Sequence, residues 1–519
     1  MLGFMVSKHF PGRTLSVPRL ALLMLVAAAV VMAALTGWSR VEDGWKAAAG
    51  QGFFAGYVDA TATPMYAFEN PRSAQGESVM LSFVVADPQD PCAPSWGAAY
   101  SLDEARSSLD LDRRIARLVQ SGGEVSVSFG GLLNDELATV CTNIDKLTGA
   151  YREVVERYSL GAIDLDIEAG NLTDRDAGVR RAKAIAALQQ ERAAADKPLA
   201  VWLTLPVAPS GLTEQGTDDV ARMLAAGVDL AGVNVMTMDY GQSRSKSMTM
   251  ADAAIAAAES THRQLTVLYS RAGIDLGPQA LWRKIGVTPM IGQNDVPGEV
   301  FDLDAAVAIN TFVLDKGVGR VSMWSLNRDV SCGSNYADTA IVSDSCSGVE
   351  QHGVRFADAL GAGLSGRATM LRDAPAPTET PRSVAIDDPA TSPYPIWEEQ
   401  ATYAAQDRVV WHRSVYVAKY WTQGDLPDNP VLQATETPWV LLGPVLPGET
   451  PEPRVTVLPG TFPGWDPETV YVKGDRILLE GEVFEAKWWN RAESPEATQR
   501  NSDASPWRAI DAAEVEKAD

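Results

Sequence analysis

The chain has 519 residues, of which 46% are hydrophobic and 21% are charged, and its formal net charge is −23. This length exceeds that of one ordinary domain, so we expect several domains. An acidic surface repels polyanions, which argues against nucleic acid as a partner, whereas a neutral polymer is unaffected by it.

The N-terminal segment is basic at first and then apolar without interruption from Leu20 to Leu35. Its basic residues are Lys8, Arg13 and Arg19. A secretory signal peptide has this layout, so residues 1–44 are predicted to hold an export signal and a short linker. No small-x-small cleavage site follows, and the stretch up to Trp38 is long enough to anchor the chain in a membrane uncleaved. We favour cleavage and an extracellular protein, with N-terminal membrane association as the alternative.

Four cysteines occur in the chain, Cys92, Cys141, Cys332 and Cys346, and their spacings do not fit a metal site. In an exported protein such cysteines are expected to form disulfides, for which three pairings can be drawn. If the strands described next are right, Cys92 and Cys141 follow adjacent strands, and the other two cysteines share one loop. Those pairings are then geometrically the easiest.

Short runs rich in Val, Ile and Leu alternate with amphipathic segments of helical period along much of the chain. The apolar runs are Phe53–Ala60, Val79–Ala86, Glu124–Gly131, Gly161–Glu168, Leu199–Val207, Gly232–Tyr240, Lys284–Gln293 and Arg320–Arg328. The helix-like segments are Ser101–Gln120, Ile144–Tyr158, Arg175–Ala195, Gln215–Ala226, Met250–Gly273 and Leu303–Lys316, with Thr61–Ser78 the weakest. Eight β/α units predict an α/β fold, a single (β/α)8 barrel over residues 45–362, with its active site at the carboxyl ends of the strands.

The fourth run carries three acids, Asp164, Asp166 and Glu168, which alternate with aliphatic residues. On a β-strand alternate side chains share a face, so the three carboxyl groups point the same way. Burying neighbouring carboxylates is costly unless they share protons or find partners, so their place at the end of a core strand indicates catalysis. A half-exposed strand with a solvated acidic face and a carboxylate metal site are the alternatives.

Other predicted strands also end in residues suited to a substrate site. The glycines Gly130 and Gly131, two residues after Ser128, would let a substrate approach the backbone. Further candidates at strand ends are Met236, Asp239, Tyr240, Gln293 and Trp324. The four histidines lie off the strand ends, and the acids sit on one strand rather than several, so we expect no metal and no cofactor.

The stretch from about Phe53 to Phe356 resembles the chitinases of glycoside hydrolase family 18. The signature strand of that family reads Asp-x-x-Asp-x-Asp-x-Glu, and Asp164, Asp166 and Glu168 match its last three acids. Gly161 stands where the first signature Asp belongs.

Three more segments carry the same resemblance. Ser128, with the two glycines that follow, matches the family's Ser-x-Gly-Gly strand, and Trp324 matches the last-strand Trp. The sixth-strand pattern Met-x-Tyr-Asp is met at Met236 and Asp239, but Met238 replaces the usual Tyr. Tyr240, expected on the same strand face, is a candidate stand-in.

The resemblance implies substrate-assisted, retaining hydrolysis, in which the substrate's own N-acetyl group is the nucleophile. Glu168 would protonate the glycosidic oxygen, and Asp166 would orient the acetamido N–H. Asp164 would keep a proton shared within the stack, because adjacent like charges raise one pKa. Asp239 and Tyr240 would help to fix the acetamido group, while Trp324 would floor its subsite.

The composition changes after the predicted barrel. Residues 363–393 and 444–461 include stretches rich in Pro, Thr and acids, which are predicted to be linkers. The segments 394–443 and 462–510 repeat each other at an offset of 68 residues. Aligned pairs include Trp397 with Trp465, Tyr416 with Phe484 and Trp439 with Trp507. The tail therefore contains a duplicated small module.

Each module is unusually rich in aromatic residues for its size. The runs ending at Trp421 and Trp489 resemble the Ala-Lys-Trp-Trp signature of the three-stranded chitin-binding modules of carbohydrate-binding families 5 and 12. Flat rings stack on the apolar faces of sugars, so Tyr420, Trp421, Trp488 and Trp489 are the candidate chitin contacts. Because neighbours in a strand face opposite ways, one ring of each pair could instead belong to the module core.

The sequence as a whole predicts an exported, monomeric chitinase that hydrolyses β-1,4 bonds between N-acetylglucosamine residues of chitin and its oligomers. An endo-β-N-acetylglucosaminidase acting on glycans is one alternative, although tandem chitin-binding modules would serve it little. A non-catalytic chitin lectin is the other, but such proteins usually lack the signature Glu that is present here as Glu168.

Overall fold

The computed structural model describes residues 52–368 except 275 and 337, together with 386–428, 437–451, 457, 460–496 and 505–510. The N-terminal apolar run, on which the predicted export or anchoring depends, lies outside these residues, as does most of the linker 363–393. Among the helices that can be described, none is both long and apolar enough to cross a bilayer.

The larger part of the molecule is a closed barrel of parallel strands. Its strands are β1 (Phe53–Phe54) with β2 (Gly56–Asp59), β3 (Ser78–Ala86), β6 (Glu124–Gly130), β7 (Ala162–Asp166), β8 (Ala200–Ala208), β10 (Leu230–Met236), β11 (Ile285–Thr288) and β14 (Arg320–Val321). The barrel closes because β14 pairs with β1 and β2 pairs with β3. The predicted (β/α)8 fold is confirmed.

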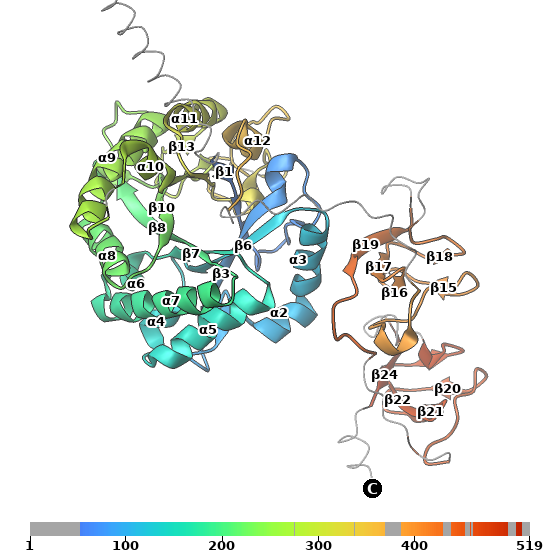
Figure 1. Cartoon of the computed structure of the whole chain (residues 1–519). Coiled ribbons are helices and arrows are strands. Elements are labelled where there is room, and N and C mark those ends of the chain that lie inside the picture. Colours follow the sequence, from blue (N-terminus) through green and yellow to red (C-terminus); the bar gives the residue numbers. More distant parts are fainter. Residues whose placement is uncertain are drawn as a thin grey trace, which may run out of the picture.

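Helices surround the strands as a ring (Figure 1). They are α2 (Leu102–Ser108), α3 (Leu111–Gln120), α4 (Leu137–Val140), α5 (Ile144–Arg157), α6 (Ala169–Thr173), α7 (Arg175–Ala194), α8 (Glu214–Ala225), α9 (Met250–Arg271), α10 (Pro278–Arg283), α11 (Leu303–Lys316) and α12 (Phe356–Gly361). Side-chain caps start several of them, for example Asn143 before α5 and Asp302 before α11. The connection 61–78, the weakest helix by sequence, contains only the 3-10 turn η1 (Ala74–Glu77).

Shorter elements decorate the barrel. They are β4 (Pro94–Trp96), β5 (Tyr100–Ser101), β9 (Gly211–Leu212), η2 (Gly241–Ser243), β12 (Gly292–Gln293), β13 (Val300–Phe301) and η3 (Leu326–Arg328). The pair β12–β13 is an antiparallel hairpin between β11 and α11. This hairpin holds part of the candidate site.

Strand β7 shows how the alternating sequence positions the acids. Ile163 and Leu165 are fully buried in the main hydrophobic core. Asp164 points the other way, into the barrel, where it reaches side chains of four other strands. The predicted separation of an aliphatic face from an acidic face is therefore present.

Several predicted strands are shorter than their apolar runs. Strand β10 ends at Met236, and Asp239 lies beyond it with a left-handed φ of 48°. The expectation that Tyr240 shares a strand face with Met238 is therefore wrong, since neither belongs to a strand. In the eighth run, β14 ends at Val321, and η3 begins only at Leu326.

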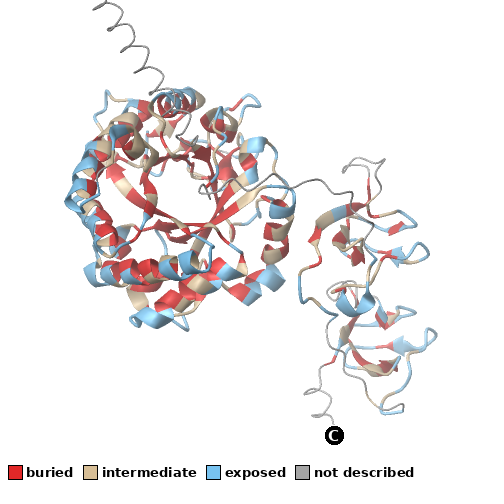
Figure 2. Cartoon of the chain, viewed as in Figure 1, coloured by how far each residue is buried: buried red, intermediate tan, exposed pale blue. Residues whose placement is uncertain are grey.

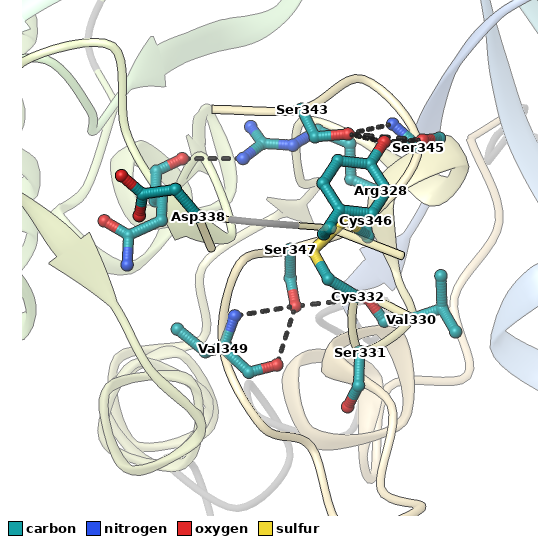
Figure 3. Close-up of a disulfide and its surroundings, with 12 residues drawn as sticks. Arg328, Val330, Ser331, Cys332, Asp338, Ser343, Ser345, Cys346, Ser347 and Val349 are labelled. Carbon is teal, nitrogen blue, oxygen red and sulfur yellow. Dashed lines mark hydrogen bonds between the residues drawn. A yellow bond between two sulfur atoms is a disulfide. The ribbon is translucent and has the colours of Figure 1, made fainter. Parts of the chain in front are cut away.

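Both disulfides follow the geometrically easiest pairings. Cys92 joins Cys141 across 49 residues, and Cys332 joins Cys346 across 14 residues. The second bond closes a loop beside Arg328 and Ser347 (Figure 3). This loop packs on the β12–β13 hairpin, since the Gln293 N–H donates to the Ser347 carbonyl at 2.8 Å.

The tail contains two small all-β modules of the same design. The first has β15 (Thr402–Tyr403), β16 (Arg408–Trp411), β17 (Ser414–Ala418), β18 (Thr422–Gln423) and β19 (Trp439–Pro444), preceded by the turn η4 (Pro389–Thr391). The second has β20 (Val470–Tyr471), β21 (Arg476–Leu479), β22 (Glu482–Ala486), β23 (Asn490–Arg491) and β24 (Trp507–Ala509). Each strand of the second starts 68 residues after its counterpart, for example 470 − 402 = 68, so the duplication extends to the fold.

Each module has a minimal core. A buried Trp, Trp439 or Trp507, donates its indole N–H to a loop carbonyl at 2.8 Å in both copies. Strand β19 runs one residue past the predicted module end at 443. Figure 2 shows that buried residues are fewer in the modules than in the strands of the barrel.

Candidate active site

The deepest acid, Asp164, is fully buried and ion-paired with Arg320, whose Nη1 lies 2.6 Å from Oδ1. The hydroxyls of Tyr57, Ser128 and Thr204 also donate to its two oxygens, at 2.8, 2.8 and 2.6 Å. These four contacts hold the Asp164 side chain in one position inside the barrel. The expectation that Asp164 keeps the shared proton of the stack stays a prediction.

The middle acid, Asp166, has the opposite surroundings. It is 4% exposed, and burial, followed by the charges of Glu168 and Asp164, raises its pKa well above the usual value. Arg320 opposes this shift only in part. Its buried Oδ1 has no hydrogen-bond partner among the described residues, which is uncommon for a buried oxygen and indicates a position for a ligand donor.

The outermost acid, Glu168, lies just past the end of β7 and directly before α6. Burial, and then the charge of Asp239, raise the pKa of Glu168 to about 7. The side chain nevertheless remains partly exposed. A carboxyl group that is accessible and keeps its proton near neutral pH has the properties of a general acid.

Asp239 is held in its left-handed conformation by the loop of the β12–β13 hairpin. The Val296 N–H donates to its Oδ1 at 3.0 Å, and the Asp239 N–H donates to Asn294 Oδ1 at 3.3 Å. Burial raises the pKa of Asp239 as well. The hairpin therefore fixes this acid at the position from which it acts on Glu168.

Glu299 anchors the neighbouring backbone and was not predicted from the sequence. Its carboxylate is buried and accepts the N–H groups of Tyr240 at 2.9 Å and Gly241 at 3.1 Å. Arg244 pairs with it at 3.2 Å. Tyr240 itself is only 5% exposed, so a direct substrate contact through its ring requires the covering residues to move.

The residues of the Ser-x-Gly-Gly segment pack inside the protein. Ser128 is fully buried against Asp164. A Cβ on Gly130 would lie 2.2 Å from the Asp166 carbonyl oxygen, and one on Gly131 would lie 2.9 Å from the Phe83 ring. The close approach of β6 to β7 at Gly130, and of Phe83 to Gly131, gives both glycines a structural reason. That they also open the backbone to substrate stays a prediction.

Trp324 is partly exposed and lies over Phe83, with ring centroids 5.5 Å apart and planes 20° from parallel. One of its faces is thus supported by an aromatic ring, as a sugar platform requires. Met236 and Gln293 are also partly exposed. The Gln293 carbonyl accepts from Arg328 Nη2 at 2.6 Å, which ties this residue to the loop drawn in Figure 3.

The sequence did not single out the partners of Asp164. Tyr57, Thr204 and Arg320 are polar residues within otherwise apolar runs, and this interruption was the available signal. Asn234 extends the same network by donating to Thr204 Oγ1 at 3.0 Å. Such residues meet only when the barrel closes.

The aromatic pairs of the modules are exposed on both members. Tyr420 and Trp421 are 52% and 64% exposed, and Trp488 and Trp489 are 44% and 63% exposed. The alternative in which one ring of each pair belongs to the core is therefore wrong. The core position is filled by the Trp on the last strand of each module.

Comparison with known proteins supports both parts of the chain. The catalytic domain of a chitinase from Pyrococcus furiosus superposes with a TM-score of 0.50 at 27% sequence identity, covering 60% of this chain and 95% of that one. The predicted resemblance to the chitinases of glycoside hydrolase family 18 is confirmed. Residues 464–508 match carbohydrate-binding module family 5/12, so the barrel is followed by a segment similar to such a module.

Two curated relatives each match about half of this chain. A probable bifunctional chitinase/lysozyme of Escherichia coli is 37% identical over 265 residues, which are 49% of this chain and 28% of that protein. Endochitinase 11 of Metarhizium anisopliae is 35% identical over 264 residues, which are 48% of this chain and 47% of that protein. The chain thus spans less than half the length of either relative.

Proposed function

We propose that this protein hydrolyses β-1,4 bonds between N-acetylglucosamine residues of chitin by substrate-assisted, retaining catalysis. One observation carries the proposal: Glu168, with its pKa raised to about 7, stands beside the buried Asp166, whose Oδ1 is unpaired among the described residues. A proton donor and an acceptor for an acetamido N–H are the two groups that this mechanism needs. The relatives named as chitinases support the choice of substrate.

In the first step, Glu168 gives its proton to the glycosidic oxygen as the bond to the anomeric carbon breaks. Asp166 accepts the acetamido N–H, and the acetamido carbonyl oxygen bonds to the anomeric carbon to form an oxazolinium ion. In the second step, Glu168 takes a proton from water, which attacks the same carbon and reopens the ring. Two displacements retain the anomeric configuration, and no protein carboxylate acts as nucleophile.

Asp164 serves this chemistry as a fixed charge below the reacting groups. Its ion pair with Arg320 fixes its position, and its charge is one cause of the raised pKa of Asp166. The charge of Asp239 likewise raises the pKa of Glu168. The partly exposed Trp324 forms the floor against which the sugar is held.

We further propose that the modules bind chitin chains through their exposed rings and that the enzyme works outside the cytoplasm. The aromatic pairs offer flat apolar surfaces that match sugar faces. Two disulfides and the basic and apolar N-terminal segment support export. Mass spectrometry of the secreted protein should find a new N-terminus between about residues 33 and 49, whereas an intact chain in the membrane fraction would support the anchor.

Product analysis on defined oligomers tests the proposal. The full chain should shorten N-acetylglucosamine oligomers, while glucosamine oligomers of the same length should stay intact because they lack the acetamido nucleophile. Chelators should not affect the rate. Cleavage of the deacetylated oligomers would contradict substrate assistance, and no cleavage of either set would contradict the proposed activity.

A further inference from the structure

The first module lies against helix α3 of the barrel (Figure 1). The contact on the module side comes from β19 and the residues just after it. Arg113 on α3 donates from Nη1 to the Pro444 carbonyl at 2.6 Å, and its Nη2 lies 2.5 Å from Glu449 Oε1. The side chains of Arg113 and Glu449 are only 3% and 8% exposed, so this ion pair is buried between barrel and module.

The backbone of the module is also shaped for this contact. A Cβ on Gly443 would lie 2.7 Å from Arg113 Cγ and 2.8 Å from the Arg113 carbonyl oxygen. Only glycine therefore allows β19 to approach α3 so closely. One turn further along the helix, Arg117 donates to the Leu441 carbonyl.

The second module provides an internal comparison, because it repeats the first at an offset of 68 residues. In the sequence, Asp511 takes the place of Gly443, and Lys517 takes the place of Glu449. Either change would oppose docking on Arg113, the first by steric conflict and the second by like charge. The last strand of the second module also ends at Ala509, three residues before the counterpart of Pro444.

We propose that the first module is docked on α3 as a fixed part of the catalytic unit, through a surface that the second module lacks. The exposed pair Tyr420 and Trp421 precedes β18, whereas the barrel contact is made by β19, so docking leaves these rings accessible. A polysaccharide chain held by the first module therefore keeps a constant direction relative to the barrel. The second module contributes attachment without a set orientation. This inference concerns the domain arrangement and does not depend on the proposed hydrolysis.

Distance measurements between spin labels in the full chain test the docking. All four native cysteines are in disulfides, so introduced cysteines are the only free thiols. One label goes on the exposed Val307 of α11, and the second goes on Gln423 or on Arg491, which are exposed and equivalent positions of the two modules. The pair Val307→Cys with Gln423→Cys should give a narrow distance distribution, and the pair with Arg491→Cys a broader one.

Charge variants then identify the anchor. Glu449→Lys should broaden the distribution of the first pair, while Glu399→Lys, the same charge change at an exposed site of the same module, should leave it narrow. Adding Arg113→Glu to Glu449→Lys should restore the narrow distribution, which a misfolded module would not allow. Equal widths for the two label pairs in the parent chain would overturn the docking. If the distribution of the first pair stayed narrow in Glu449→Lys, the ion pair would not be the anchor of the docked module. A double variant that did not restore the narrow distribution would contradict the ion pair in the same way.

Discussion

The barrel and the modules differ in which energetically unfavourable side-chain placements they contain. The barrel buries charge, as in the fully covered pair of Asp164 and Arg320, whereas the modules expose large aromatic rings, as at Trp421 and Trp489. A buried charge needs specific partners and so fixes one geometry. An exposed ring gains binding free energy when an apolar surface covers it, and many similar surfaces can do so. The difference matches the roles proposed above, which are bond cleavage by the barrel and attachment by the modules.

The largest effect is expected from Glu168→Gln, which keeps the shape of the side chain but removes its acidic proton. General acid catalysis is worth roughly 10²–10⁴-fold, so kcat on N-acetylglucosamine oligomers should fall by at least about 10²-fold, with oligomer binding nearly unchanged. Steady-state kinetics and calorimetric titration measure the two quantities. A variant that keeps more than about a tenth of the wild-type rate would place the acid elsewhere.

The next effect concerns stability. Arg320→Met leaves Asp164 buried without its cation, so the free energy of unfolding should fall by about 3–5 kcal/mol in a urea titration. The double variant with Asp164→Asn should recover part of this loss, because no unpaired charge remains. A loss below about 1 kcal/mol, as for an exposed ion pair, would show that the pair is not the structural anchor of the acidic strand.

A smaller effect is expected in the pH profile. Glu168 must be protonated to act as an acid, so kcat/KM should decline as the pH rises through about 7, the value to which its pKa is raised. Asp239→Asn removes a negative charge that raises this pKa, so the alkaline limb should move to lower pH. Asp304→Asn, an equal charge change at an exposed position of α11, should leave the limb in place. If Asp239→Asn did not move the alkaline limb, the charge of Asp239 would not be a cause of the raised pKa of Glu168.

The smallest effect belongs to the modules. Replacing Trp421 and Trp489 together by Ala should reduce activity on crystalline chitin several-fold, within the range that linked binding sites give. Turnover of short soluble oligomers should not change, because the barrel meets them by diffusion. Val470→Ala, at another exposed apolar site of the second module, is the control. If activity fell equally on soluble and insoluble substrates, the rings would serve the folding of the modules rather than attachment to chitin.

The features that the sequence predicted correctly depend on local periodicity. Alternation along β7 predicts that Asp164 and Asp166 share a face, and the 68-residue repeat predicts two equivalent modules. Glu168, predicted on the same face, lies just past the end of the strand. Neither prediction needs knowledge of which strands meet in space. The same alternation left open which of the three acids carries a proton.

What the sequence could not predict depends on closure of the barrel. Arg320 reaches Asp164 across 156 residues of chain, and the closed barrel, in which β14 lies between β11 and β1, brings them together. That contact gives Asp164 a buried partner, while burial and the neighbouring acids raise the pKa of Asp166. The left-handed backbone at Asp239 likewise depends on the hairpin that carries Asn294, which no local pattern places there.

The central claim is that the substrate's acetamido group, and no protein carboxylate, attacks the anomeric carbon. Proton NMR of the first-formed products from a fully acetylated oligomer tests it most directly, before mutarotation mixes the anomers. Substrate-assisted catalysis predicts the β-anomer at the newly formed reducing end. Initial release of the α-anomer would mean direct attack by water and would contradict the mechanism.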